Sequence, residues 1–199
     1  MKLDFRKTTF WGVAASVEAC PPSDMPEVVL SGKSNVGKSS LLNALSDNKK
    51  MAKVSQTPGK TRQVVYFVVD SQFYIADLPG YGYANAPKHE KEKFSKLVEQ
   101  YFASERPISL ILHLMDIRHS PSKNDQQMIA YMQNAGFPFF MVFTKADKLS
   151  RSRALQAIRE HTAFLGIKGV PSFLVSADKK QGLDELKAAI TEKIFPEKE

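Results

Sequence analysis

The chain has 199 residues, a formal net charge of +7 and a single cysteine. This length predicts one domain whose core needs no covalent cross-links, and one cysteine excludes an intramolecular disulfide, which favours a cytoplasmic protein. No apolar run reaches the roughly 18 residues of a membrane span, so we expect no membrane segment. The basic excess favours an anionic partner.

Residues 1–25 are predicted to form an N-terminal extension packed on a main domain that spans residues 26–199. Within the extension, one strand is expected from about Phe10 to Ala19, because an apolar stretch there ends at two consecutive prolines. This strand would lie at the edge of the sheet of the main domain.

A secretion signal is the alternative interpretation of the N-terminus, since basic, apolar and small residues precede Cys20. Asp4 lies in the region that should be basic, and Glu18 lies two residues before the cysteine. Both acidic residues are atypical of a signal peptide, so we expect the segment to be part of the folded protein.

Six strand-like runs follow and alternate with helical patterns. The fourth and fifth are almost continuously apolar, which is typical of strands buried on both faces of a parallel sheet. About two residues around Ser71 join the second and third, so these two must form an antiparallel hairpin. The pattern predicts a three-layer α/β/α fold with a mostly parallel six-stranded sheet, one antiparallel strand and the extra N-terminal edge strand. The runs are 27–30, 63–70, 72–78, 109–116, 138–144 and 172–177.

Five helices are expected between and after these runs. The first begins at Lys38 and extends to Ala44 or beyond, and Pro87 suits the first turn of the second. In the other four, apolar residues recur at spacings of three and four, which marks one face of a helix. These residues are Phe94, Leu97, Val98, Tyr101 and Phe102; then Met128, Ile129 and Met132; then Leu155, Ile158 and Leu165; and finally Leu183, Leu186, Ile190 and Ile194.

The segment GKSNVGKS at residues 32–39 matches the phosphate-binding pattern G-x-x-x-x-G-K-[ST], between a strand and a helix. Glycine lets the backbone wrap a phosphate, successive N–H groups form an anion-binding nest, and the helix N-terminus adds its dipole. We expect Lys38 to reach the outer phosphates and the Ser39 hydroxyl to bind Mg²⁺. The alternative is a chance match in a loop rich in glycine and serine.

Two further segments complete the phosphate side of the predicted site. In DLPG, which ends a strand, Asp77 is expected to hold Mg²⁺ through a water and the Gly80 N–H to contact the γ-phosphate. In the earlier TPGKTR, Thr61 is expected to complete the Mg²⁺ shell, with Thr57 as the alternative. The Pro-Gly pair of that segment favours a mobile turn, as a nucleotide-sensing switch requires.

The segment TKAD at residues 144–147 is expected to select the base. Asp147 can accept hydrogen bonds from guanine N1–H and N2–H₂, which adenine does not offer, and the Lys145 stem can cover the base plane. Alternatively, Asp147 caps the N-terminus of a helix. In SAD at residues 176–178, N–H groups near Ala177 are expected to bind guanine O6.

These motifs together look like those of a translation-factor-type GTPase in the TrmE-Era-EngA-EngB-Septin-like P-loop superfamily. GKSNVGKSSLLNAL, TPGKTR, DLPGYGYA, MDIRH and TKADK resemble the EngB/YsxC family of bacterial GTP-binding proteins, from about residue 25 to the C-terminus. The resemblance implies a P-loop GTPase fold (G domain) and a role in assembling the large ribosomal subunit, with an associated role in cell division and septation. It implies rRNA and ribosomal proteins as partners, and neither DNA nor a membrane. One small domain is expected to be a monomer.

Matching positions imply binding of GTP or GDP with Mg²⁺, the metal being held by Ser39 and Thr61. Lys38, Thr61, Gly80 and Asn35 are expected to act on the reacting phosphate. The last motif departs slightly, with Ala177 and Asp178 where other members vary. The implied nucleotide contacts are Gly32, Lys33, Ser34, Asn35, Val36, Gly37, Lys38, Ser39, Gly59, Lys60, Thr61, Arg62, Gln63, Asp77, Leu78, Pro79, Gly80, Thr144, Lys145, Ala146, Asp147, Ser176, Ala177 and Asp178.

Hydrolysis is expected to be slow. Many GTPases place a glutamine directly after D-x-x-G to orient the attacking water, whereas Tyr81 stands there in this chain. We expect an intrinsic rate on the order of 10⁻³ s⁻¹ or below. Asn35 occupies a position where related GTPases bind K⁺, which would stabilise transition-state charge. Alternatively, Asn35 only braces the loop.

Two segments are expected to contact partners. YGYANAP at residues 81–87 follows the phosphate-sensing glycine and is interpreted as a second switch, the alternative being a packed turn with Tyr81 or Tyr83 in the core. Five basic residues between Asp47 and Asp70 favour contact with RNA phosphate, the alternative being a solvated loop. Roles in structure and in partner binding stay open for Arg118 and His119. The basic residues are Lys49, Lys50, Lys53, Lys60 and Arg62.

Two other classes of function compete with an enzymatic switch. In the first, GTP occupancy gates binding to the ribosome and hydrolysis is incidental. In the second, the chain is an ATPase or a small-molecule kinase with a P-loop, which TKAD argues against.

Overall fold

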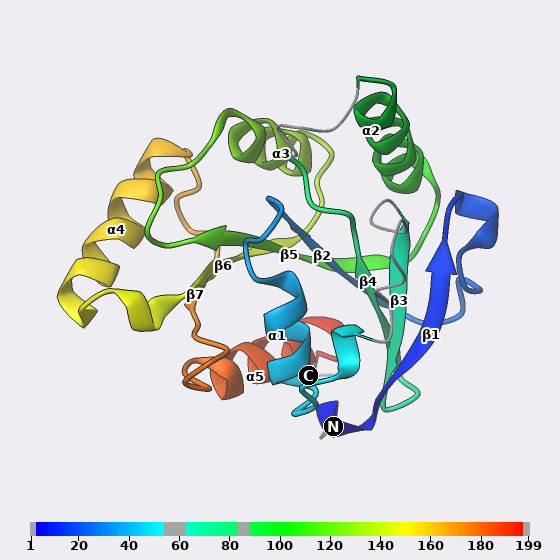
Figure 1. The fold of residues 1–199 in the computed structure, drawn as a ribbon, viewed down its shortest axis with the longest axis horizontal. Coiled ribbons are helices and arrows are strands. Elements are labelled where there is room, and N and C mark those ends of the chain that lie inside the picture. Colours follow the sequence, from blue (N-terminus) through cyan, green and yellow to red (C-terminus); the bar gives the residue numbers. More distant parts are fainter. Residues whose placement is uncertain (1–2, 54–62, 83–87, 197–199) are drawn as a thin grey trace.

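A seven-stranded sheet runs through the computed structural model, which describes residues 3–53, 63–82 and 88–196 (Figure 1). The strand order is β1-β3-β4-β2-β5-β6-β7, and within the described residues only β3 runs against the others. The predicted α/β architecture is therefore confirmed, and the extra N-terminal strand is present. The strands are β1 (Thr8–Ala14), β2 (Glu27–Gly32), β3 (Val64–Val69), β4 (Phe73–Asp77), β5 (Ile108–Asp116), β6 (Phe139–Thr144) and β7 (Ser172–Leu174).

The β3–β4 hairpin is the antiparallel pair that the short connection predicts. Asp70 and Ser71 have φ values of 48° and 53°. Two consecutive residues with positive φ give the turn a twist that matches the right-handed twist of the strands it joins.

The N-terminal strand lies earlier than the sequence suggests. It was expected from about Phe10 to Ala19, but β1 ends at Ala14, which pairs with Val64, the first residue of β3. After Ala14 the chain leaves the sheet and forms a short 3-10 helix at Val17–Ala19. The last predicted run is also shorter, because Ser176 pairs with Gln181 instead of continuing along β6.

Helices cover both faces of the sheet (Figure 1). Apolar residues of α1 and α5 share one buried cluster with the sheet, and those of α2, α3 and α4 share the other. None of the described helices is both long and apolar enough to cross a bilayer. The helices are α1 (Lys38–Leu45), α2 (Lys88–Ala103), α3 (Lys123–Asn134), α4 (Arg151–Phe164) and α5 (Leu183–Ile194).

The predicted inner face of α4 is only partly correct. Ile158 and Leu165 pack against the buried cluster, whereas Leu155 is 46% exposed. Ala154, Ala157 and His161, which the spacing did not indicate, are buried. The expected role of Pro87 at the start of α2 lies outside the described residues, as does the side chain of Phe94.

A buried ion pair ties three segments together where β2 begins. The Arg106 guanidinium pairs with the fully buried Glu27 carboxylate, with one N–H bond of 2.8 Å from Nε to Oε1. The Tyr101 hydroxyl of α2 donates to the other carboxylate oxygen at 2.6 Å. Arg106 also donates to the Pro21 carbonyl at 2.9 Å, so the N-terminal extension and α2 are both attached to the base of the central strand.

Candidate functional site

The sequence motifs meet at one edge of the sheet. The strands β2, β4, β5 and β6 run in the same direction and end at Gly32, Asp77, Asp116 and Thr144. In open α/β sheets, ligands bind outside the carboxyl ends of the strands. The segments 32–39, 77–80 and 144–147 therefore lie at the same edge of the sheet, as expected.

The segment 32–39, called the P-loop below, has the backbone geometry that its glycines predict. Gly32 has φ 148°, and a Cβ there would lie 2.7 Å from the Leu114 carbonyl oxygen. Gly37 has φ 115° and precedes the first residue of α1, Lys38. The first N–H groups of α1, which have no partner within the helix, are available to an anion at this end.

The segment that follows D-x-x-G packs directly on the P-loop. A Cβ at Gly80 would lie 2.8 Å from the Ser34 Cα, so no larger residue fits there. Ser34 N–H donates to the Tyr81 carbonyl at 2.8 Å, and Tyr81 N–H donates to the Gly32 carbonyl at 3.3 Å. We expected successive N–H groups of the P-loop to point at phosphate. In this structure the Ser34 N–H instead donates to the Tyr81 carbonyl.

Lys38 and Asp77 form the charged centre of the phosphate side. Lys38 Nζ lies 3.7 Å from Asp77 Oδ1, and that oxygen is buried without a hydrogen-bond partner among the described residues. Burial raises the pKa of Asp77, and the neighbouring Lys38 charge opposes this.

The residues present fit a Mg²⁺ ion. The unpartnered Asp77 oxygen is a suitable acceptor for a metal-bound water, and Ser39 is exposed in the first turn of α1. The described residues contain no cluster of three His, Cys, Asp or Glu side chains for a metal. Mg²⁺ is typically held by few protein groups together with substrate phosphates, so such a cluster is not required. Thr61 lies outside the described residues, as do Gly59, Lys60 and Arg62.

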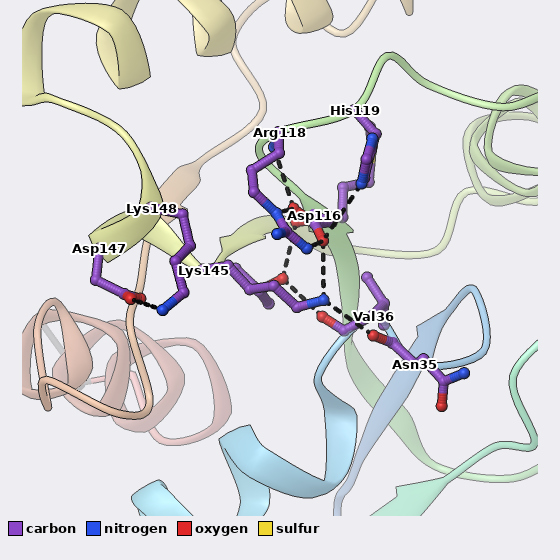
Figure 2. Close-up of polar contacts among 10 residues, drawn as sticks. Asn35, Val36, Asp116, Arg118, His119, Lys145, Asp147 and Lys148 are labelled. Carbon is purple, nitrogen blue, oxygen red and sulfur yellow. Dashed lines mark hydrogen bonds and ion pairs between the residues drawn. The ribbon is translucent and has the colours of Figure 1, made fainter.

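Thr144 and Lys145 join the TKAD segment to the P-loop. The Thr144 hydroxyl donates to the Val36 carbonyl at 2.7 Å. Lys145 Nζ donates to the Asn35 carbonyl at 3.2 Å (Figure 2). Asn35 and Lys145 both have positive φ, 62° and 61°. Asparagine adopts this conformation readily, whereas for Lys145 it is unfavourable and tends to persist where surrounding contacts fix it. Thr144 thus acts as a brace within this structure.

Asp147 is preoriented by neighbours on both sides. The Ser176 hydroxyl donates to its Oδ1 at 2.7 Å, and Lys148 Nζ lies 2.9 Å from Oδ2 (Figure 2 shows the second contact). These hydrogen bonds lower the pKa of Asp147 from 3.8 to about 2. The alternative role as a cap of the next helix is wrong, because Ser150 caps α4 and its hydroxyl accepts from Arg153 N–H.

The Tyr81 side chain is packed, as the alternative interpretation of its segment predicts. Its hydroxyl donates to the Asp125 carboxylate, and its ring stacks on the buried His113 with centroids 6.3 Å apart. The same Asp125 accepts from the backbone and hydroxyl of Ser122 at the start of α3. The rest of the predicted second switch, residues 83–87, lies outside the described residues.

Sequence reasoning missed part of the constellation. Asp116 ends a predicted strand and belongs to the MDIRH motif, but it was given no role at the site. In the structure Lys145 Nζ lies 2.9 Å from its Oδ2, and Arg118 donates to both of its oxygens (Figure 2). Its position at the end of a parallel strand was the available signal. A cavity of about 250 Å³ lies beside this group and the P-loop, lined by residues that include Lys33, Asn35, Asp116, Ser122, Asp125 and Lys145.

Comparison with known proteins agrees with this geometry. Residues 27–145 match the family model described as "50S ribosome-binding GTPase". A protein of Syntrophomonas wolfei described as a "Probable GTP-binding protein EngB" is 39% identical over 96% of this chain and 99% of its own length. A protein of Porphyromonas gingivalis with the same description is 38% identical over 92% of this chain and 93% of its own.

Solved structures show the same fold. A crystal structure of a probable GTP-binding protein engB superposes with a TM-score of 0.72 at 21% identity, over 84% of this chain and 98% of its own. A structure of Era in complex with MgGDPNP and nucleotides 1506–1542 of 16S ribosomal RNA has a TM-score of 0.64 at 24% identity, over 87% of this chain and 57% of its own.

Proposed function

The chain belongs to the EngB family of GTP-binding proteins, and from that premise we propose that it is a GTP-dependent switch in assembly of the large ribosomal subunit. It is a P-loop GTPase. One observation supports the proposal best. The Lys38–Asp77 pair, which is suited to binding phosphate and Mg²⁺, and the preoriented carboxylate of Asp147 lie at the same edge of the sheet.

In the proposed complex, the two ends of the nucleotide contact different motifs. Asp147 accepts from guanine N1–H and N2–H₂, N–H groups near Ala177 face O6, and the Lys145 stem covers the base. Lys38 and the first N–H groups of α1 hold the phosphates. Ser39 and Thr61 would hold Mg²⁺, which neutralises charge that develops on the phosphates.

Hydrolysis by the isolated protein is proposed to be slow. The Tyr81 hydroxyl is engaged by Asp125, so it is not directed at an attacking water in this structure. Asn35 is left with two roles, binding of K⁺ or bracing of the loop. Replacing KCl by NaCl at equal ionic strength separates them, because an unchanged rate of GTP turnover removes the ion from the mechanism.

The proposed partner is the large ribosomal subunit or its precursor, engaged through rRNA and ribosomal proteins in the cytoplasm. Lys49 and Lys50 are exposed, which supports contact with RNA phosphate. Five phosphate contacts would give a log–log salt slope of roughly −4. If neutralising Lys49, Lys50 and Lys53 leaves ribosome association and its salt dependence intact, this surface is not the contact. The role in cell division and septation rests on the family resemblance alone.

The test compares binding of purified large subunits with a GTP analogue, with GDP and without nucleotide, measured by co-sedimentation. A switch predicts strong binding in the GTP-analogue state only. Equal binding in all three states contradicts it.

A GTP-gated binding module remains the second candidate, because the hydroxyl of Tyr81, the residue directly after D-x-x-G, is engaged by Asp125 instead of being directed at a water. A variant that binds GTP but does not hydrolyse it distinguishes the two. The enzymatic switch predicts that such a variant stays trapped on the subunit, whereas the binding module predicts normal release.

A further inference from the structure

We propose that Asp116 is a positioning residue for nucleotide binding, because it fixes the Lys145 ammonium group beside the P-loop. The inference rests on the proposed contact between the Lys145 stem and the base. It adds a residue that is absent from the implied nucleotide contacts.

The contacts form a short chain from the surface to the P-loop (Figure 2). Arg118 donates from Nε to Asp116 Oδ1 at 2.9 Å and from Nη2 to Oδ2 at 2.7 Å. Lys145 Nζ lies 2.9 Å from Asp116 Oδ2 and 3.2 Å from the Asn35 carbonyl oxygen.

The exposure of these groups indicates which of them fixes the others. The side chain of Asp116 is 13% exposed, that of Lys145 32% and that of Arg118 39%. Arg118 also donates its backbone N–H to Asp116 Oδ1 at 3.1 Å, so the carboxylate is the most fully held of the three. A flexible lysine gains a defined position from such a fixed carboxylate, because each hydrogen bond to a charged partner removes rotational freedom.

The carboxylate that selects the base belongs to a separate group. Asp147 takes its hydrogen bonds from Ser176 and Lys148. Loss of the Asp116 charge should therefore shorten the residence time of the nucleotide without changing the preference for guanine. This separation distinguishes a positioning role from general damage to the site.

The experiment measures release of a fluorescent GDP analogue by stopped flow from the full-length protein. Asp116→Asn keeps the shape of the side chain but removes its charge, and we expect roughly tenfold faster release, as for loss of one charged hydrogen bond. His119→Ala is the matched control: His119 Nε2 lies 3.9 Å from the same carboxylate, but the side chain is 72% exposed. Release from the control should stay within about twofold of wild type.

A double-mutant cycle identifies the route of the effect. If Asp116 acts through Lys145, Asp116→Asn has no further effect in a Lys145→Met background. Competition by inosine diphosphate, which lacks the 2-amino group, should give the wild-type preference for GDP in Asp116→Asn and an altered one in Asp147→Asn.

Unchanged release in Asp116→Asn, or equal acceleration with and without Lys145, overturns the proposal. Unchanged release in Lys145→Met instead overturns the proposed contact with the base. Thermal melting checks that each variant is folded. If the asparagine variant is not, Asp116→Ser is compared in the same way and carries the same expectation.

Discussion

At the scale of single residues, Asp147 shows how neighbours fix a charge before any ligand arrives. The hydrogen bonds from Ser176 and Lys148 lower its pKa to about 2. Because the folded-state pKa of Asp147 lies below the ordinary value of 3.8, the stabilisation from these contacts is complete above about pH 5 and is lost as pH falls through about 2. Asp147 is therefore a ready hydrogen-bond acceptor at every physiological pH.

Ser176→Ala removes the largest of these contributions. We expect the carboxyl carbon of Asp147, followed by NMR, to titrate near 2 in the wild type and closer to 3.8 in the variant. GDP affinity should not vary with this group between about pH 5 and 8 in either protein. The same titration midpoint in both proteins would mean that Ser176 does not lower the pKa of Asp147.

The motif residues of the candidate site were predictable, but their partners were not. Gly32, Lys38 and Asp77 belong to short sequence motifs, and the residue types within each motif indicate its chemistry. The hydrogen bond from Ser176 to Asp147 joins residues 29 positions apart, so it exists only once two strands are placed side by side. The same holds for the contact between Asp116 and Lys145.

At the scale of elements, hydrophobic spacing predicted that α4 exists and placed Ile158 and Leu165 correctly on its packed face, but it misplaced Leu155, which is exposed. Ala154 and Ala157 are buried instead. Which small residues of a helix face the sheet depends on how the two pack, and this is a tertiary property. The continuous apolar run of β5 was interpreted correctly, because a strand covered on both faces has only one pattern.

The buried pair of Glu27 and Arg106 links α2 to β2 and gives an element-scale prediction. Arg106→Met leaves the Glu27 carboxylate buried without its cation. We expect the free energy of unfolding, measured with urea, to fall by about 3–5 kcal/mol. Adding Glu27→Gln to this variant should recover much of the loss, and a double variant no more stable than Arg106→Met would contradict this explanation.

At the scale of the whole molecule, the N-terminal extension shares its packing with the main domain. Phe5 lies in one buried cluster and Ala14 in the other, and β1 pairs with β3 along its length. The division at residue 25 stays a prediction. These contacts suggest that the two parts fold as one cooperative unit.

Deleting residues 1–14 tests that cooperativity. The deletion removes β1 and exposes the edge of β3, so we expect a lower melting temperature and self-association in sedimentation experiments. The full-length protein is measured in parallel as the reference. If loss of residues 1–14 leaves both properties unchanged, the extension is an independent appendage.

The irregular pairing of β1 also affects how separate molecules meet. The pairing of β1 with β3 changes register between Phe10 and Gly12, which marks a β-bulge. β1 is an edge strand of the sheet, and Phe10 and Trp11 are 37% and 42% exposed. A straight margin bearing two aromatic rings would invite strands of other copies to add on and extend the sheet without limit. The interrupted spacing of N–H and C=O groups prevents such a strand from forming a continuous set of hydrogen bonds, so the bulge protects this edge of the sheet against aggregation.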